Sequence, residues 1–301
     1  MNPTDAAEKN IWSDDIKVTA LLAGTCLVLF VTRRPMAPIA SFAEVGLRVV
    51  FLAPLFIFLA WKTRKPALVA GASILPFAWQ VAEDTLNRTP NPPGVVHYPT
   101  AGKMLVIILT VVAVAWIGRG RWTQYGITLR FRKGTARRAL IIVLGVVIFE
   151  IVLAFLLVKT GIVSHQEIQR QSAVGKMPLW QAALFQFVVV GIAEEFSNRG
   201  FLQTYIDRLF GTTIRIWDAE LGWGFLITAL LFTAAHMLEA RTWPLHFIWM
   251  PEQFIFIFPF SLLVGYLRAY TGTLVPAILV HGLWDGMGAV VLSYLFLHSI
   301  F

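Results

Sequence analysis

Long apolar stretches separated by short polar segments fill most of the sequence. The candidate stretches are residues 16–31, 45–61, 66–82, 104–117, 139–158, 180–193, 221–237, 254–267 and 275–297. A helix needs about 20 apolar residues to cross a bilayer, and tilt and ragged ends allow about 17–25. Some stretches are shorter, so the pattern predicts about eight or nine transmembrane spans. Backbone amides in lipid must be paired within their own segment, so each span is expected to be a helix.

Composition points to the same class of protein. Of the 301 residues, 57% are hydrophobic and 14% are charged, whereas soluble domains carry about 25% charged residues. The polar surface is too small to cover a globule of this length, so lipid must cover much of it. We therefore expect an all-α fold, a polytopic transmembrane helical bundle. Residues 1–138 would form N-terminal helices and a basic loop, and residues 139–301 the main membrane domain.

The net charge of +8 is interpreted as setting the orientation of the protein in the membrane and not as a nucleic-acid-binding surface. The basic residues lie between the apolar stretches, in the predicted loops. One cluster is Lys62, Arg64 and Lys65, and the other lies at residues 119–138. Two predicted spans separate the clusters, so both fall on one side, which is expected to be cytoplasmic together with the N-terminus. Arg33 and Arg34 then face outward, against this rule. The compact build favours a bacterial inner (plasma) membrane.

Ionisable residues within membrane helices are costly, so each one calls for a reason. The richest cluster follows the stretch 184–193 and contains Glu194, Glu195 and Arg199. Glu195 and Arg199 are spaced i,i+4, so they can form an ion pair on one helix face. Glu194 lies about 100° around the helix from Glu195 and is expected to face a polar cavity.

Two further polar features lie on separate predicted helices. His236 ends an otherwise uncharged stretch, and His281 and Asp285 are spaced i,i+4 on the last one. A carboxylate can take a proton from water, and a nearby imidazole can orient that water, donate to a leaving amine or ligate a metal. Each feature alone also fits helix packing. Glu150, within 139–158, is expected either to line the cavity or to make an interhelical hydrogen bond.

Taken in order, these residues resemble a known pattern. Glu194-Glu195-x-x-x-Arg199, Phe232-x-x-x-His236 and His281-x-x-x-Asp285 are similar to the three motifs of the CAAX-protease and bacteriocin-processing family, which includes the type II CAAX prenyl proteases. The turn 266–276 is also similar to the family's approach to its last motif. The similar region covers about residues 180–286.

The resemblance implies an intramembrane endopeptidase with a conical active-site cavity. Glu194 would be the general base, assisted by His236, while His281 and Asp285 would stabilise the oxyanion or hold the site. Glu195 and Arg199 would brace the helix. A divalent metal such as zinc stays open, and Glu194, His236 and His281 would be its ligands. Two positions depart from the family, because Asn198 replaces a usual aromatic and residue 285 is Asp where Asn is common.

Three functions follow as hypotheses. The first is an intramembrane endopeptidase that uses glutamate- and histidine-activated water on a membrane-associated protein or peptide, with membrane lipid around it and no nucleic-acid partner. The second is a non-catalytic membrane scaffold or maturation partner on the same fold. The third is a small transporter that uses the polar cluster as an ion relay, against which the lack of an inverted repeat argues. The motif set favours the endopeptidase.

Overall fold

The computed structural model describes residues 36–64, 81, 100–160, 184–242, 245–251 and 253–286. The predicted span 16–31, most of 66–82 and the last part of 275–297 lie outside these residues.

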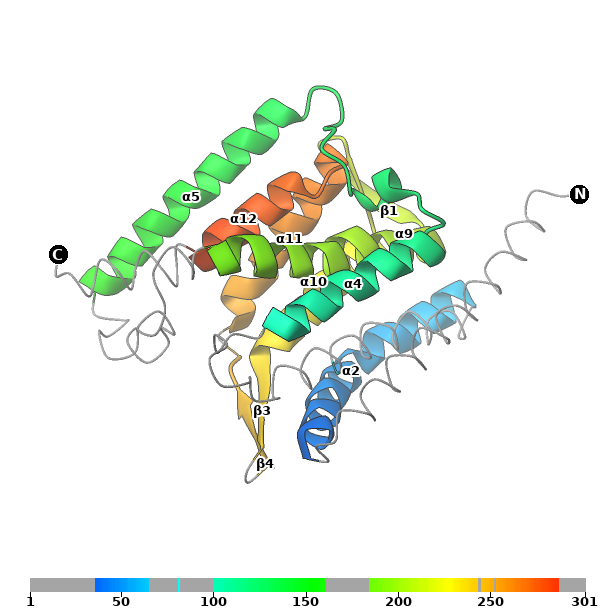
Figure 1. Ribbon diagram of the computed structural model, residues 1–301, viewed down its shortest axis with the longest axis vertical. Helices are drawn as coiled ribbons and strands as arrows, with labels where there is room; N and C mark the ends of the chain where they lie inside the picture. Colours follow the sequence, from blue (N-terminus) through cyan, green and yellow to red (C-terminus); the bar gives the residue numbers. More distant parts are fainter. Residues whose placement is uncertain are drawn as a thin grey trace, which may run out of the picture.

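Helices dominate the described part of the chain (Figure 1). They are α2 (Met36–Thr63), α4 (Thr100–Trp116), α5 (Ala136–Lys159), α10 (Trp223–Met237), α11 (Gln253–Thr271) and α12 (Val275–Gly286), with the short 3-10 helix η1 (Trp122–Tyr125). Each of the six longer helices covers nearly all of one predicted apolar stretch, or of the part of it that is described. The sequence prediction of helices at these places is confirmed.

One long helix lies at the centre of the fold and alternates between two kinds of winding. The π-helix η3 (Phe185–Val190), the α-helix α8 (Gly191–Glu195), the π-helix η4 (Phe196–Gln203) and the α-helix α9 (Thr204–Phe210) follow one another without a break. The sequence predicted a regular α-helix here. A change from α to π winding leaves carbonyl groups without their usual partner. Two side chains donate to carbonyls where α8 passes into η4, because Ser197 Oγ donates to the Ala193 carbonyl and Asn198 Nδ2 donates to the Glu194 carbonyl, both at 2.9 Å.

Two small antiparallel hairpins make the fold mostly helical instead of all-α. Strands β1 (Thr212–Ile216) and β2 (Ala219–Gly222) pair through a two-residue turn, and β3 (Leu238–Thr242) pairs with β4 (Leu245–Trp249). Both turn residues of the first hairpin, Trp217 and Asp218, have positive φ, which matches the twist of a tight hairpin. The β-branched residues of β1 favour a strand, a local signal that the span-by-span prediction of the fold passed over.

The central helix contacts α4, α10, α11 and α12, which surround it (Figure 1). One buried apolar cluster joins it to α2, α4 and η1, and a second joins α5, α10, α11 and α12. Gly282 of α12 packs closely against the central helix, because a Cβ atom there would lie 2.9 Å from the Phe187 Cα. Glycine is needed there because two helix backbones meet. The candidate site lies on the segment of the central helix that these helices enclose.

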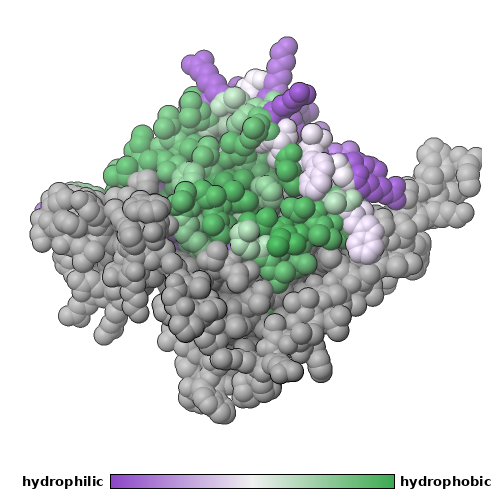
Figure 2. Space-filling view, in the orientation of Figure 1, coloured by the Kyte–Doolittle hydropathy of each residue, from purple (hydrophilic) through white to green (hydrophobic). Residues whose placement is uncertain are grey.

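The surface is apolar where lipid would lie. The outward face of α5 exposes a row of large hydrophobic side chains, Leu140, Ile141, Leu144, Ile148, Phe149, Ile151, Val152, Phe155 and Leu156. Hydrophobic residues cover the middle of the face in Figure 2, and hydrophilic residues gather along its upper edge, near the connection between α4 and α5. An exposed apolar surface of this size marks a membrane or protein interface.

Within the described residues, one helix, Gln253–Thr271, is both long and apolar enough to cross a membrane. Three shorter apolar helices, Leu52–Lys62, Gly102–Trp116 and Trp223–Met237, accompany it. The count of eight or nine spans therefore stays a prediction, as does the conical cavity.

Candidate active site

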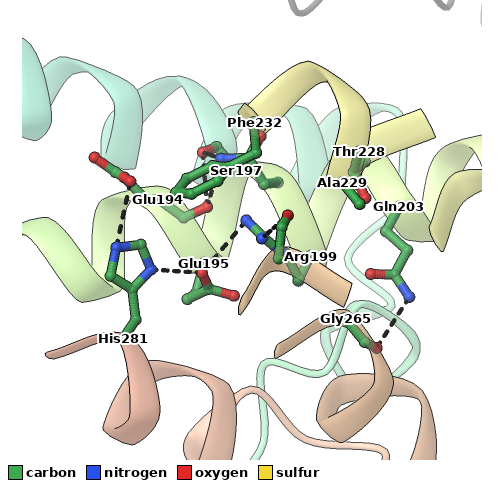
Figure 3. A network of polar contacts seen from close by, with 12 residues as sticks. Glu194, Glu195, Ser197, Arg199, Gln203, Thr228, Ala229, Phe232, Gly265 and His281 are labelled. Atoms are coloured by element: carbon green, nitrogen blue, oxygen red, sulfur yellow. Dashed lines mark hydrogen bonds and ion pairs between the residues drawn. The ribbon is translucent and has the colours of Figure 1, made fainter. Parts of the chain in front are cut away.

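Four of the predicted polar residues, Glu194, Glu195, Arg199 and His281, lie close together at the long central helix (Figure 3). Glu194 and Glu195 end the short α8, and Arg199 follows in η4. His281 and Asp285 reach this point from α12, which packs against both α8 and η3. The sequence could place these groups on separate helices, and the fold brings them together.

Glu195 and Arg199 form the sealed side of the site. Both side chains are 0% exposed, and Arg199 Nη1 lies 3.4 Å from Glu195 Oε1. Arg199 Nη2 also donates to the Ser261 Oγ on α11 at 2.6 Å, and its guanidinium stacks 4.5 Å from the Phe232 ring centroid on α10. The predicted i,i+4 pair is confirmed. Through the contacts of Arg199, this ion pair links the central helix to α10 and α11.

His281 links the two glutamates. Its Nδ1 lies 2.7 Å from Glu195 Oε1, so Nδ1 carries the proton and donates it to that carboxylate. Its Nε2 lies 3.4 Å from Glu194 Oε2 and 3.4 Å from Asp285 Oδ2. A carboxylate on the far nitrogen fixes the orientation of an imidazole ring, as it does for catalytic and metal-binding histidines. The predicted i,i+4 contact between His281 and Asp285 is confirmed.

Lys103 completes the site, and the sequence analysis missed it. The Lys103 ammonium, near the start of α4, donates to Glu194 Oε1 and forms an ion pair with it. Glu194 thus has Lys103 on one oxygen and His281 on the other. The signal was present, because a lysine that begins an apolar helix needs a partner. Ninety-one positions separate the two residues, so spacing could not identify the partner.

His236 lies beside this network. Its Nδ1 donates to the Phe232 carbonyl oxygen at 2.8 Å, which leaves Nε2 as the acceptor of a neutral ring. The Phe232 ring packs 4.5 Å from the His236 ring and 5.7 Å from the His281 ring. Among the described residues, no hydrogen bond joins His236 to Glu194. The structure therefore places His236 next to the site through Phe232.

Exposure divides the network into two layers. The side chains of Glu194, Lys103 and Asp285 are 16%, 12% and 28% exposed, whereas Glu195 and Arg199 are sealed at 0%. The first three groups are therefore the charged side chains of the network that the surroundings can reach. The buried pair is positioned to hold the outer layer in place.

The arrangement does not match a metal site. Nowhere in the described ranges do three or more His, Cys, Asp or Glu side chains form a group that could hold a metal ion. The proposed ligands are otherwise engaged, because Lys103 is bonded to Glu194, His236 Nδ1 to the Phe232 carbonyl and His281 Nδ1 to Glu195. An ammonium group on a ligand carboxylate repels a second cation.

Glu150 lies on α5, close enough to Asp285 for the two carboxyl groups to interact electrostatically. Both of its carboxylate oxygens are buried, and neither accepts a hydrogen bond from the described residues. Of the two expectations for this residue, the interhelical hydrogen bond is not found in this part of the chain.

Comparison with known proteins bears on the same segment. The family model described as type II CAAX prenyl endopeptidase Rce1-like matches residues 176–287. This segment is similar to the Rce1-like family over 112 of the 301 residues of the chain. It contains all three motifs that carried the resemblance, and the assignment indicates a membrane-embedded protease. No curated protein and no solved structure matches the chain.

Proposed function

We propose that this chain is an intramembrane endopeptidase that hydrolyses a peptide bond of a membrane-associated protein or peptide. The observation that carries the proposal is the partly exposed Glu194 carboxylate, held between Lys103 and His281 within the Rce1-like segment. A carboxylate with fixed neighbours and one open side is suited to act as a general base toward water.

In this reaction Glu194 takes a proton from a water molecule, whose oxygen then bonds to the peptide carbonyl carbon. The tetrahedral intermediate collapses as the C–N bond breaks, and the leaving nitrogen takes the proton from Glu194. His281 orients Glu194 through Nε2, and Glu195 holds the His281 ring through Nδ1. Asp285, an acceptor on the same nitrogen, also orients this ring. His236 would assist with the water through its Nε2.

The surroundings support a membrane setting. The exposed basic residues between α4 and α5 favour a cytoplasmic position for this connection. We propose a bacterial inner (plasma) membrane location with the N-terminus in the cytoplasm, and a protein or peptide substrate reached from the bilayer.

Hydrolysis by the detergent-purified protein tests the proposal. A peptide library with prenylated and unmodified members is incubated with the wild type, Glu194→Gln and Glu220→Gln, whose site is an exposed carboxylate on β2. We expect Glu194→Gln to lose about 10²-fold or more in rate, and the Glu220 control to keep the wild-type rate. A folded wild type that cleaves nothing would instead favour a non-catalytic scaffold.

A further inference from the structure

Lys103 needs an explanation that the proposed reaction has not yet supplied. Its side chain is only 12% exposed and carries an ammonium group at the start of an apolar helix. A lysine in an apolar environment is costly unless an opposite charge compensates it, and a buried ion pair often contributes little net stability. Stabilisation of the fold alone therefore does not explain the ion pair between Lys103 and Glu194.

Hydrolysis of a peptide bond places negative charge on the carbonyl oxygen, and a donor must be ready where this charge develops. The carboxylates of Glu194 and Asp285 cannot donate. Arg199 cannot reach a substrate, because its side chain is 0% exposed and is engaged with Glu195 and with Ser261.

The remaining side-chain donors at the site are also committed. Asn198 Nδ2 donates to the backbone carbonyl of Glu194 at 2.9 Å and to Ser197 Oγ at 3.5 Å. The Nδ1–H group of His236 donates to the Phe232 carbonyl, and the Nδ1–H group of His281 donates to Glu195. The Nε2 atom of His281 faces two carboxylate oxygens at 3.4 Å each, so any proton on it is directed toward them.

We propose that Lys103 is the N–H donor that stabilises the oxyanion formed when water activated by Glu194 attacks the peptide carbonyl. This inference rests on the proposed function. The Lys103 ammonium is already bonded to Glu194, so it lies beside the position where the attacking water must stand. A charged donor makes a shorter and stronger hydrogen bond to an anion than a neutral one.

The protons balance without any change at Lys103. The proton that leaves water goes to Glu194 and then to the leaving nitrogen, and the Lys103 ammonium keeps its protons throughout. As the water proton neutralises Glu194, the attraction between Glu194 and Lys103 weakens, and the new oxyanion becomes the stronger partner for the ammonium. The donor therefore binds the transition state better than the ground state, which is the requirement for catalysis.

Substitution of Lys103 tests this role in the full-length, detergent-purified protein. Lys103→Met keeps the length and apolar stem of the side chain and removes the charge and the N–H donors. Lys103→Arg keeps both. Lys159→Met, at the exposed end of α5, is the matched control. For each variant, kcat and KM are measured on a peptide that the wild type cleaves, and Ki is measured for a phosphinate analogue of that peptide, which mimics the tetrahedral intermediate.

Lys103→Met is expected to lower kcat by about 10²–10³-fold with little change in KM. The affinity for the phosphinate should fall by a similar factor, because only the tetrahedral species carries the negative oxygen. Lys103→Arg should recover most of both losses, and Lys159→Met should match the wild type. A residue that merely stabilises the helix packing would not change the phosphinate affinity in proportion to kcat.

A folded Lys103→Met variant with wild-type kcat and wild-type phosphinate affinity would overturn the inference alone, provided that hydrolysis still depends on Glu194. Hydrolysis that survives in Glu194→Gln, or a wild type that cleaves nothing, would overturn the proposed function and this inference with it. If Lys103→Met does not fold, Lys103→Gln replaces it, because it removes the charge and keeps a polar side chain. Lys103→Gln should then still show the loss in phosphinate affinity.

Discussion

The sealed pair of Glu195 and Arg199 allows a quantitative test of what holds the site together. Removing one partner leaves an uncompensated charge in a position with 0% exposure. Such a change costs roughly 3–5 kcal/mol in the free energy of unfolding. At about 2–4 °C per kcal/mol, Arg199→Met should lower the melting temperature by roughly 6–20 °C. The variant also loses the hydrogen bond to Ser261 and the cation–π contact with Phe232.

The double variant Glu195→Gln/Arg199→Met should recover a large part of this loss. The side-chain oxygen of the introduced glutamine would still accept the proton of His281 Nδ1, and no buried charge would be left alone. In the wild type, Glu195 Oε2 and Arg199 Nε have no hydrogen-bond partner among the described residues. The pair is therefore imperfectly satisfied, and replacing both members costs less than the sum of the two single changes.

Thermal unfolding in detergent of the wild type, the two single variants and the double variant measures this coupling. Arg215→Met is the control, since Arg215 pairs with Asp218 on the surface at 3.2 Å with 67% and 68% exposure. Such exposed pairs contribute about 0–1 kcal/mol. A double variant whose loss equals the sum of the single losses within about 0.5 kcal/mol would refute the reasoning.

Three further predictions concern a buried acid, a helix contact and the metal question. Burial raises the pKa of Asp207, at the end of the central helix, to about 7, although the Gly224 N–H donates to it. Its folded state therefore binds the proton more tightly than the unfolded chain, and stability should fall as the pH rises from about 4 to about 7. Asp207→Asn should flatten that part of a melting-temperature profile, and an unchanged slope would contradict the assignment. Gly282→Ala should lower the melting temperature because its Cβ would lie 2.9 Å from the Phe187 backbone, while Gly145→Ala, with nothing within 4 Å, should not. Hydrolysis should continue in a chelator that stops a zinc peptidase run in parallel, because the ammonium of Lys103 holds Glu194; loss of activity restored by added zinc would show the opposite.

The parts of the fold that depend on local chemistry could be predicted from the sequence. The length of the apolar stretches predicted the positions of the helices. The i,i+4 spacing predicted the contacts of Glu195 with Arg199 and of His281 with Asp285. The turn before α12 was also predictable, since Gly272 has a φ of 75° that favours glycine.

The parts that depend on tertiary packing could not be predicted. Nothing in the local pattern joins Lys103 to Glu194 or Arg199 to Ser261, because those pairs form only when α4 and α11 pack against the central helix. The sequence predicted His236 among the catalytic groups, but it could not predict the contacts of the Phe232 ring with the His236 and His281 rings, which depend on how α10 packs against α12. The catalytic role of each residue stays a proposal that the substitutions above test.

The π winding of η4 changes how the number of residues determines the direction of the side chains in the central helix. A π turn holds about one residue more than an α turn, and each residue of an α-helix turns the chain by about 100°. Loss of one residue from η4 could thus be absorbed by rewinding to a regular helix, at the cost of rotating one half against the other. The half that carries Glu194 would then lose its alignment with Gln203, whose amide donates to the Gly265 carbonyl at 3.3 Å. The number of residues in η4 therefore sets the rotation of the half with Glu194 relative to the half with Gln203.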